Sequence, residues 1–406
     1  MSRTFPRLHK RAAALCCLSL YVLPCLSGAA PAQQPKTILI GFSGALGGVS
    51  EQFGKSQANA AEMALIEANR HHPRIGGQPV FFRLLRHDDH NQPEAAAAVA
   101  RQLLKAGVAA VIGTTDSGTA RVAAKIYSDA GVALLSPAAS AAALAEQGNA
   151  GFFSMIGHDG HAGAYLADYA MHELNMRRIA VIDNGSMYGM AAAATVHERI
   201  CQAGFRPVLR ERVGYASDLQ QLAWQIRQSG AQGVFFGGYA QAASLARALH
   251  RTGRGPRLML ASSGEVGSPF LVAARSAAAE VLAIEPGLPE TGLPGWRRFE
   301  RDYRERFGAD PYGLAPFAYD AAQVLLAAIR QGDSAEPGKI IEALRQIRFK
   351  GLTGTVAFDE AGYPRHPLFT VYTVRDRHWV PLRTYEGPPR RAENDKGCAA
   401  AAAVRR

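Results

Sequence analysis

Two short clusters of histidine and aspartate are the first places in this sequence where chemistry could occur. Residues 87–90 read HDDH and residues 158–161 read HDGH. Imidazole nitrogens and carboxylate oxygens bind metals, but neither cluster has the ligand spacing of a known zinc or calcium site. One cluster ends a predicted strand and the other precedes a predicted helix, which favours capping and solvated loop roles. We therefore expect no metal site.

The motifs of common hydrolases and nucleotide-dependent enzymes are missing. No serine stands in the G-x-S-x-G pattern of a nucleophile elbow, and there is no P-loop. Glycines between residues 41 and 48 resemble a dinucleotide loop, but Asp88 and Asp89, at the end of the next strand, lie much farther on than the about 20 positions that a ribose-binding acid requires. We expect a protein that is not an enzyme and binds no cofactor. An exported α/β hydrolase with an unrecognised nucleophile is the alternative from another class.

A third pattern points to binding. Residues 134–140 read LLSPAAS, so an apolar run that is typical of a buried strand ends in small residues. Small side chains leave backbone N–H and C=O groups accessible to something that approaches the main chain. The alternative is an N-cap, Ser136 or Ser140, for a helix over ASAAALAEQ. The residues alone leave both interpretations open.

Alternating strand and helix patterns must position these groups. From Thr37 on, apolar runs such as TILIGFSG and AAVIGT alternate with amphipathic patterns such as ANAAEMALIEANR. This alternation predicts parallel sheets with helices on both faces. The pattern restarts after Met155, and the body exceeds the usual size of one core, so we expect two α/β lobes. GTVAFDEAGYP reads as a hairpin, and LFTVYTVRDRHWVPL reads as two strands with a turn at Arg375-Asp376, so late elements must pack onto lobes already begun.

The amino-terminal residues have the features of a secretory signal peptide. Four basic residues precede an apolar run over residues 12–23, and small residues flank Pro31. The run is shorter than the about 20 residues of a membrane span. A lipoprotein would be anchored at Cys25, but Pro24 before it fits that processing poorly. We expect cleavage after Ala32 and a soluble, exported protein.

The net charge of +11 is concentrated at the two ends of the chain. Without residues 1–32 and 387–406, the body carries 36 basic and 32 acidic side chains, which is ordinary for a soluble protein and predicts no nucleic-acid partner. Residues 387–406 have little to bury and are expected to be disordered. The cysteines outside the signal peptide, Cys201 and Cys398, imply no disulfide framework.

The order of the strand ends resembles that of the branched-chain amino-acid binding proteins of ABC importers, which have the periplasmic binding protein type I fold. The similar segments are IGFSGALGG, RHDDHNQPEAAAAVARQLL, VAAVIGTTDSGTARVAAKIYSDAGVALLSPAAS, RRIAVIDNGSMYGMAAAATV and GVFFGGYAQAASLARAL. The similarity extends from Thr37 to about Tyr385. It implies two Rossmann-like α/β lobes with parallel-sheet cores, joined by a hinge of several crossings.

The resemblance also implies where the lobes begin and end. After a signal peptide over residues 1–32, the first lobe comprises residues 33–157 and about 287–360. The second lobe comprises residues 158–286 and about 361–386, and a tail follows over residues 387–406.

The binding residues of the family can be carried over to this sequence. In the first lobe, Ser117 matches a serine that holds the ligand carboxylate. Ala138, Ala139 and Ser140 match the small segment that offers backbone groups, and Phe53 matches an aromatic residue that packs on the ligand. Helix amino termini favour an anion at such strand ends. From the residues alone, Ser117 could equally be an N-cap and Phe53 a core residue.

In the second lobe, the resemblance implies that Tyr188 and Tyr239 close over the ligand and that Glu265 holds its ammonium group. An ammonium requires a buried carboxylate as its counter-ion. The tyrosines could instead be half-buried residues at helix starts.

This chain departs from the family pattern in two ways. Asn91 and Asp116 replace a disulfide, and Asp116 adds a negative charge beside the expected carboxylate unless it caps the helix. The segment from Ser262 to Gly267 has one extra residue, which makes the match of Glu265 depend on the alignment. Without that acid, the ligand would be an amide, urea or an aromatic acid.

Together these points predict a receptor that binds a small amino acid, of the branched-chain type, between the lobes and delivers it to permease subunits of an ABC transporter. The resemblance implies a periplasmic monomer that is not inserted in the membrane. A receptor for an amide, urea or an aromatic acid, or a ligand sensor, is the alternative on the same fold.

Overall fold

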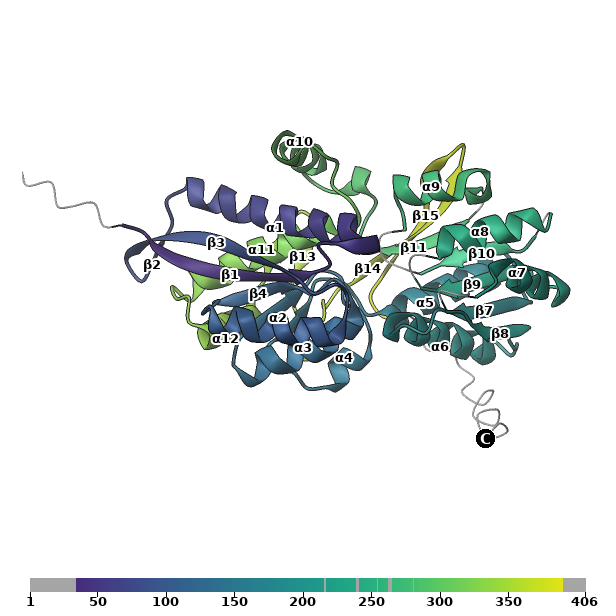
Figure 1. Cartoon of the computed structure of the whole chain (residues 1–406), viewed down its shortest axis with the longest axis horizontal. Helices are drawn as coiled ribbons and strands as arrows, with labels where there is room; N and C mark the ends of the chain where they lie inside the picture. The colour runs from purple at the N-terminus through teal and green to yellow at the C-terminus, as the bar shows by residue number, and fades with distance from the viewer. Residues whose placement is uncertain are drawn as a thin grey trace, which may run out of the picture. The chain divides into compact units, whose positions relative to one another are not determined.

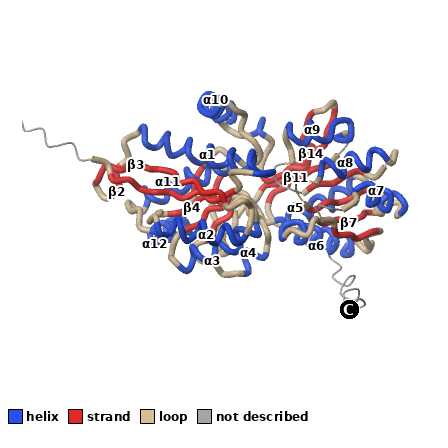
Figure 2. The backbone as a smooth tube through the Cα atoms, viewed as in Figure 1, coloured by secondary structure: helices blue, strands red, loops and turns tan. Residues whose placement is uncertain are grey.

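The computed structural model describes residues 34–214, 217–238, 241–253, 255–261, 265–279 and 281–389. The predicted signal peptide, Tyr239 and most of the predicted tail lie outside this part of the chain. The described strands fall mainly into two sheets with helices packed on them, as Figure 1 and Figure 2 show.

The first sheet has the strand order β2-β3-β1-β4-β5-β6. Its strands are β1 (Lys36–Gly44), β2 (Arg74–Ile75), β3 (Gln78–Asp88), β4 (Ala110–Gly113), β5 (Ala133–Ser136) and β6 (Phe152–Ser154). Every pairing is parallel except that of β2 with β3. Strand β4 is buried along its whole length, because both faces of the sheet are covered, and this explains its continuous apolar sequence.

Two groups of helices cover the first sheet. Helices α1 (Glu51–Arg70), α11 (Ala315–Gln331) and α12 (Pro337–Gln346) share one hydrophobic core with it. Helices α2 (Pro93–Lys105) and α3 (Ser117–Asp129), with the short α4 (Ala143–Glu146), share a separate core. Helix α10 (Trp296–Phe307) packs beside α1 and ends at Gly308, whose φ of 65° suits a glycine after a helix.

The second sheet has the strand order β15-β14-β11-β10-β9-β7-β8. Its strands are β7 (Ile179–Asp183), β8 (Leu209–Arg212), β9 (Gly233–Gly237), β10 (Arg257–Leu260), β11 (Leu282–Pro286), β14 (Leu368–Arg375) and β15 (His378–Glu386). Strands β7 to β11 are parallel, whereas β14 and β15 are antiparallel to their neighbours. The predicted late strands are therefore confirmed, and their two-residue turn, Asp376 and Arg377, has positive φ at both positions.

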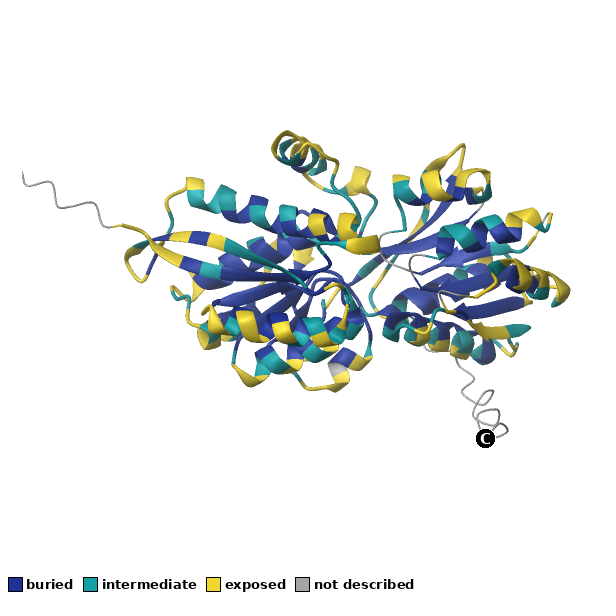
Figure 3. Ribbon diagram, viewed as in Figure 1, coloured by how far each residue is buried: buried dark blue, intermediate teal, exposed yellow. Residues whose placement is uncertain are grey.

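Helices again lie on both faces of the second sheet. Helix α5 (Asp159–Asp168), the π-helical turn η2 (Tyr169–Glu173) and α6 (Met187–Gln202) belong to one core. Helices α7 (Leu219–Gln228), α8 (Ala242–Arg251) and α9 (Ser268–Ala274), with the 3-10 turn η3 (Arg275–Ala278), belong to another. Figure 3 shows the strands as the most buried elements and the outer helix faces as exposed.

The strand orders show that the described chain passes between the two sheets three times. It crosses from β6 to α5, from β11 towards the 3-10 turn η4 (Glu290–Gly292), and from β13 (Thr355–Val356) to β14. A mixed α/β fold of two lobes with several crossings was the prediction, and it is confirmed. The predicted hairpin over GTVAFDEAGYP is different in detail, because β13 pairs with β12 (Phe349–Lys350) and only a bridge joins Phe358 to Pro364.

Three local expectations need correction. Asp89 is fully buried and accepts a hydrogen bond of 2.8 Å from the Ser43 hydroxyl, so it is not a solvated loop residue. Asp159 is buried in the first turn of α5 rather than in a solvated loop before it. Cys201 is disulfide-bonded, contrary to the expectation from cysteine spacing. Among the described residues, no helix combines the length and the apolar character needed to cross a membrane.

Candidate functional site

Ser117 joins two strand ends of the first sheet. It begins α3, just after β4, and only 1% of its surface is exposed. Its hydroxyl oxygen accepts hydrogen bonds from the backbone amides of Ser140 and Ala141, each over 3.2 Å. The side chain therefore holds the segment after β5 against the start of α3.

Asp116 is the N-cap of α3, so Ser117 is not. Its carboxylate accepts from the amides of Gly118 at 2.7 Å and Thr119 at 3.2 Å. Burial raises the pKa of Asp116, and these backbone hydrogen bonds oppose that effect. The negative charge of Asp116 thus faces the amides of the helix. An Asp116 that caps α3 in this way does not conflict with a carboxylate bound near Ser117.

The small segment from Ala138 to Ser140 is irregular and buried. The Ala139 amide donates to the Ser136 hydroxyl at 2.9 Å, and the Ser140 carbonyl accepts from the Asp159 amide at 2.8 Å. Neither Ser136 nor Ser140 starts a long helix, because the helix that comes next, α4, spans Ala143–Glu146. Small residues stand here because the backbone packs closely against neighbouring strand ends.

The glycine-rich loop after β1 serves the same close packing. Gly48 has a φ of 70°, and a Cβ at Gly54 would lie 1.8 Å from the carbonyl oxygen of Ala45. These positions need glycine for backbone conformation and close approach.

Tyr188 lies in the first turn of α6 and is 2% exposed, so it is buried rather than half-buried. Helices α3 and α6 contact each other, and Met187 packs against the core of α2 and α3. Burial raises the pKa of Tyr188, and the carboxylates of Asp159, Glu285 and Glu265 raise it further. The hydroxyl group of Tyr188 therefore lies in the electrostatic field of three carboxylates.

Glu265 and Glu285 form a linked pair at the ends of β10 and β11. The Glu285 carboxylate accepts from the amides of Glu265 at 2.8 Å and Val266 at 3.1 Å. Burial, and then the neighbouring Glu285, raise the pKa of Glu265 to about 8. Residues 262–264 lie outside the described part of the chain, so the extra residue in this segment is not placed.

Asp159 is 2% exposed and lies beside the segment held by Ser117. Its Oδ1 accepts from the Ala142 amide at 3.2 Å, whereas its Oδ2 is buried and makes no hydrogen bond to the residues that the structure describes. Burial raises the pKa of Asp159 to about 7.

Phe53 and Tyr312 contribute aromatic rings from the first lobe. The two rings meet edge to face with centroids 6.2 Å apart, and the Tyr312 amide donates to the Ser56 hydroxyl at 2.8 Å. Phe53 also packs against a small cluster that contains Ala138. The ring of Tyr312 lies against Gly267, and burial followed by Glu265 and Glu285 raises its pKa.

The structure thus brings Ser117 and the segment 138–140 together, and it places Tyr188 among the acids that include Glu265. Tyr239 lies outside the described residues. Sequence reasoning missed Glu285, Asp159 and Tyr312 as members of this group. A charged residue inside the apolar strand LAIEP was a signal for Glu285, whereas Tyr312 carried no local signal.

The arrangement combines backbone and hydroxyl groups at the start of α3 with carboxylates at the ends of β10 and β11. Such a combination complements a small molecule that carries one anionic and one cationic group. No group of three or more potential metal ligands occurs among the residues that the structure describes.

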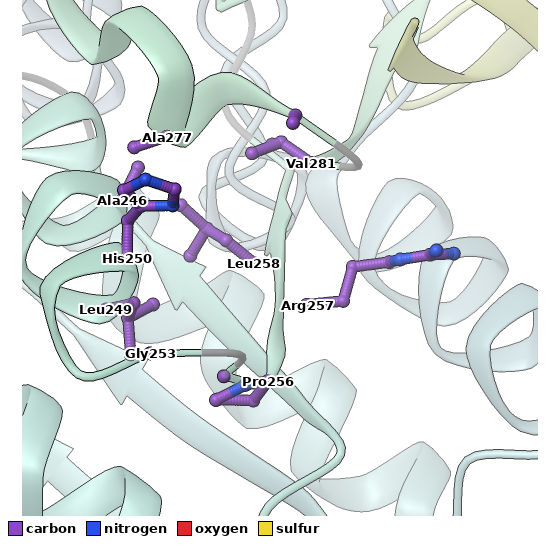
Figure 4. A pocket seen from close by; sticks show the side chains of 11 residues that line it. Ala246, Leu249, His250, Gly253, Pro256, Arg257, Leu258, Ala277 and Val281 are labelled. Atoms are coloured by element: carbon purple, nitrogen blue, oxygen red, sulfur yellow. The ribbon is translucent and has the colours of Figure 1, made fainter.

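A separate hollow of about 450 Å³ lies between α8 and β10, lined by residues that include His250, Pro256 and Val281 (Figure 4). It is at the amino-terminal ends of β10 and β11, whereas ligands of open α/β sheets bind beyond the carboxyl ends. This hollow is therefore not part of the candidate site.

Comparison with known proteins identifies the family. A family model described as periplasmic binding protein matches residues 37–377. This chain is a member of the periplasmic binding protein family. Within that family it groups with the substrate-binding proteins of branched-chain amino-acid ABC transporters, as the resemblance predicted.

The relatives of this periplasmic binding protein include several amino-acid receptors. It is 30% identical over 347 residues to a leucine-, isoleucine-, valine-, threonine- and alanine-binding protein of Pseudomonas aeruginosa. The match covers 83% of this chain and 89% of the relative. It is 24% identical over 330 residues to a Leu/Ile/Val-binding protein of Citrobacter freundii, covering 80% of this chain and 88% of the relative.

Solved structures share the fold. The substrate-binding protein LivJ of Streptococcus pneumoniae, solved in complex with isoleucine, matches with a TM-score of 0.76 and 22% identity, covering 86% of this chain and 100% of LivJ. A solute-binding protein of R. palustris in complex with benzoate matches with a TM-score of 0.75 and 16% identity, covering 86% of this chain and 96% of that protein.

Proposed function

We propose that this protein is the exported receptor of an ABC importer, that it binds a small aliphatic amino acid of the branched-chain type, and that it delivers the ligand unchanged to permease subunits. The observation that carries this proposal is the separation of charge in the candidate site. The Ser117 hydroxyl stands at the start of α3, whereas Glu265 and Glu285 are joined by a hydrogen bond at the ends of β10 and β11.

An amino acid satisfies both halves of this site. Its carboxylate is stabilised by backbone amides and the positive end of α3, and its ammonium is stabilised by Glu265. A benzoate-like ligand would satisfy only the first half, because its one charged group is a carboxylate, and it would leave Glu265 without a counter-ion. The names of the relatives support the aliphatic class, because several are leucine, isoleucine and valine binders.

A thermal-shift and calorimetric panel tests the ligand. The panel contains leucine, isoleucine, valine, threonine and alanine, together with leucinamide, 4-methylpentanoate, benzoate and urea. Leucine or a close relative should stabilise the protein by about 2.7 kcal/mol at a hundredfold excess over Kd. Leucinamide lacks the carboxylate and 4-methylpentanoate lacks the ammonium, so each should bind at least tenfold more weakly than leucine. Binding of benzoate or urea in preference to every amino acid would contradict the proposal.

The receptor role, the oligomeric state and the cleavage of the signal peptide need separate measurements. Small-angle scattering should give a smaller radius of gyration with ligand, because the two lobes close around it. Ligand recovered from the complex should be chemically unchanged, which separates a receptor from a hydrolase. Light scattering should report a monomer, and protein from the periplasmic fraction should begin at Gln33 if the signal peptide is cleaved after Ala32.

A further inference from the structure

Cys201 lies in the last turn of α6, at the opposite end of the helix from Tyr188. It is 4% exposed and disulfide-bonded. Among the residues that the structure describes it is the one cysteine, so its partner lies outside them. The other cysteines of the chain are Cys16, Cys17, Cys25 and Cys398.

Maturation of the chain leaves one candidate for that partner. The first three of these cysteines belong to the predicted signal peptide, which cleavage after Ala32 removes. Residues 33–406 contain Cys201 and Cys398 and no further cysteine. The compartment outside the cytoplasm is oxidising, so disulfides form and persist there. This step rests on the proposed export of the protein.

The end of β15 is held against α5, near the point at which the chain leaves the second lobe. The Tyr165 hydroxyl donates to the Gly387 carbonyl over 2.7 Å. The ring of Tyr165 also stacks on that of Tyr385, with centroids 4.3 Å apart. These two contacts fix where the carboxyl-terminal segment starts.

The last turn of α6 is bonded to the same helix, α5. Asp168 lies one helical turn after Tyr165, and its carboxylate accepts from the Arg199 guanidinium at 2.6 and 2.7 Å. Arg199 precedes Cys201 by two residues, and α5 and α6 share one core. Helix dimensions therefore put Gly387 within about 25 Å of Cys201. The segment from Gly387 to Cys398 can span up to about 36 Å when extended, so it is long enough.

We propose that Cys201 and Cys398 of the mature protein form an intramolecular disulfide, which fastens the carboxyl-terminal segment to the end of α6 and stabilises the second lobe. The two thiols lose two protons and two electrons as the S–S bond forms. A protein disulfide of a thiol oxidase in the exporting compartment accepts the electrons and becomes a dithiol. Since Cys201 is buried in the folded protein, this exchange must precede its burial. The cross-link stabilises the fold because it restricts the unfolded chain.

Peptide mapping without reductant tests the pairing, on mature protein isolated from the periplasmic fraction. The map should contain one cross-linked species that joins Cys201 to Cys398. Iodoacetamide should alkylate no thiol in the unfolded protein, and reduction should add the mass of two hydrogen atoms. The amino terminus, read on the same sample, shows whether the signal peptide has been removed.

Cys398→Ser removes the bond and leaves the buried residue Cys201 in place. After unfolding, this variant should have one thiol that iodoacetamide alkylates, and its thermal midpoint should be about 5–10 °C below that of the wild type. Amino-acid affinity should not change, since Tyr188 and Cys201 lie about 20 Å apart along α6. Ala400→Ser is the matched control, because it adds a serine to the same segment and keeps both cysteines. It should behave as the wild type does.

Three results would overturn the pairing. They are two alkylated thiols in the mature protein, a bond from Cys201 to a cysteine of residues 1–32, and a bond between two chains, seen as a dimer on a non-reducing gel. Equal thermal midpoints of Cys398→Ser and the wild type would overturn the stabilising role of the bond. Failure of every amino acid to bind would instead refute the proposed function, and the peptide map would still decide the disulfide.

Discussion

The backbone amide of Glu265 donates a hydrogen bond of 2.8 Å to the side chain of Glu285. Glu285 lies in the buried strand β11, so this bond attaches the loop before α9 to the sheet. The predicted ammonium partner is thereby held close to a second carboxylate, although the two charges repel each other. Several properties of the binding site should follow from this pair.

Amino-acid affinity should increase with pH. The pKa of Glu265 is about 8, so at lower pH the residue carries a proton that an incoming ammonium must displace. Affinity should therefore rise by up to about tenfold per unit between pH 6 and pH 8 and level off above that. Calorimetry in buffers of different ionisation enthalpy measures both the affinity and the released proton. In Glu265→Gln the affinity should be lower and its pH dependence lost; a flat profile in the wild type would contradict the assignment.

Replacing Glu285 should separate its charge from its hydrogen bonds. Glu285→Gln keeps an acceptor oxygen for the amides of Glu265 and Val266 but removes the repulsion, so the affinity profile should shift to lower pH. Glu285→Leu removes the acceptor, and the unfolding free energy should fall by about 1–3 kcal/mol for a buried group left unsatisfied. Denaturant unfolding and the pH titration measure the two effects. If both variants had the same unfolding free energy and the same pH profile, the separate roles of the charge and the hydrogen bonds would be refuted.

Ser117→Ala should weaken both the fold and ligand binding. The hydroxyl accepts from two buried amides, so its loss should lower the unfolding free energy by about 1–3 kcal/mol. Loss of a charge-assisted bond to the ligand carboxylate should lower the binding free energy by about 1.5–3 kcal/mol as well. Denaturant unfolding and calorimetry measure the two losses on the same samples.

Asp116 provides the control for Ser117. Asp116→Ala removes the cap of α3 and should cost about 1 kcal/mol of stability, whereas Asp116→Asn should cost little because asparagine also caps helices. Neither change should lower ligand affinity as much as Ser117→Ala does. If Ser117→Ala reduces stability alone, Ser117 only positions the segment after β5.

Stability of the ligand-free protein should fall as the pH rises from about 4 to about 7, in part because of Asp159. Its pKa is raised from 3.8 to about 7 by burial, so within this window the folded protein holds a proton that the unfolded chain has lost. Asp159→Asn cannot ionise, so its stability relative to the wild type should increase across this window. Urea unfolding at pH 4.5, 6 and 8 measures the difference. A constant difference for Asp159→Asn would refute the role of its burial.

The elements of the fold could be predicted well because their patterns are local. The run at Ala110–Gly113 is apolar throughout because neighbouring helices bury both faces of β4. The turn after β14 was predicted one residue early, because Asp376 and Arg377 both adopt positive φ, which their types alone do not require.

The site was harder to predict because its members meet only through the fold. Asp116 and Ser117 are both of types that often cap helices. In the structure Asp116 accepts from an amide of α3, whereas Ser117 accepts from the amides of Ser140 and Ala141, which are distant in the sequence. Tyr312 reaches Phe53 and Gly267 from a loop far along the chain. Proximity of this kind has no periodic signature in the sequence.

The positions of α11, β14 and β15 have a consequence for how the chain is made. Helix α11 completes a core whose strands begin at Lys36, and β14 and β15 complete a sheet that begins at Ile179. A ribosome synthesises these closing elements late, so neither lobe can bury its whole core until most of the chain has been made. Premature termination before Leu368 would leave the edge of β11 unpaired and the second lobe open, so quality control should remove such fragments rather than retain them as half-receptors.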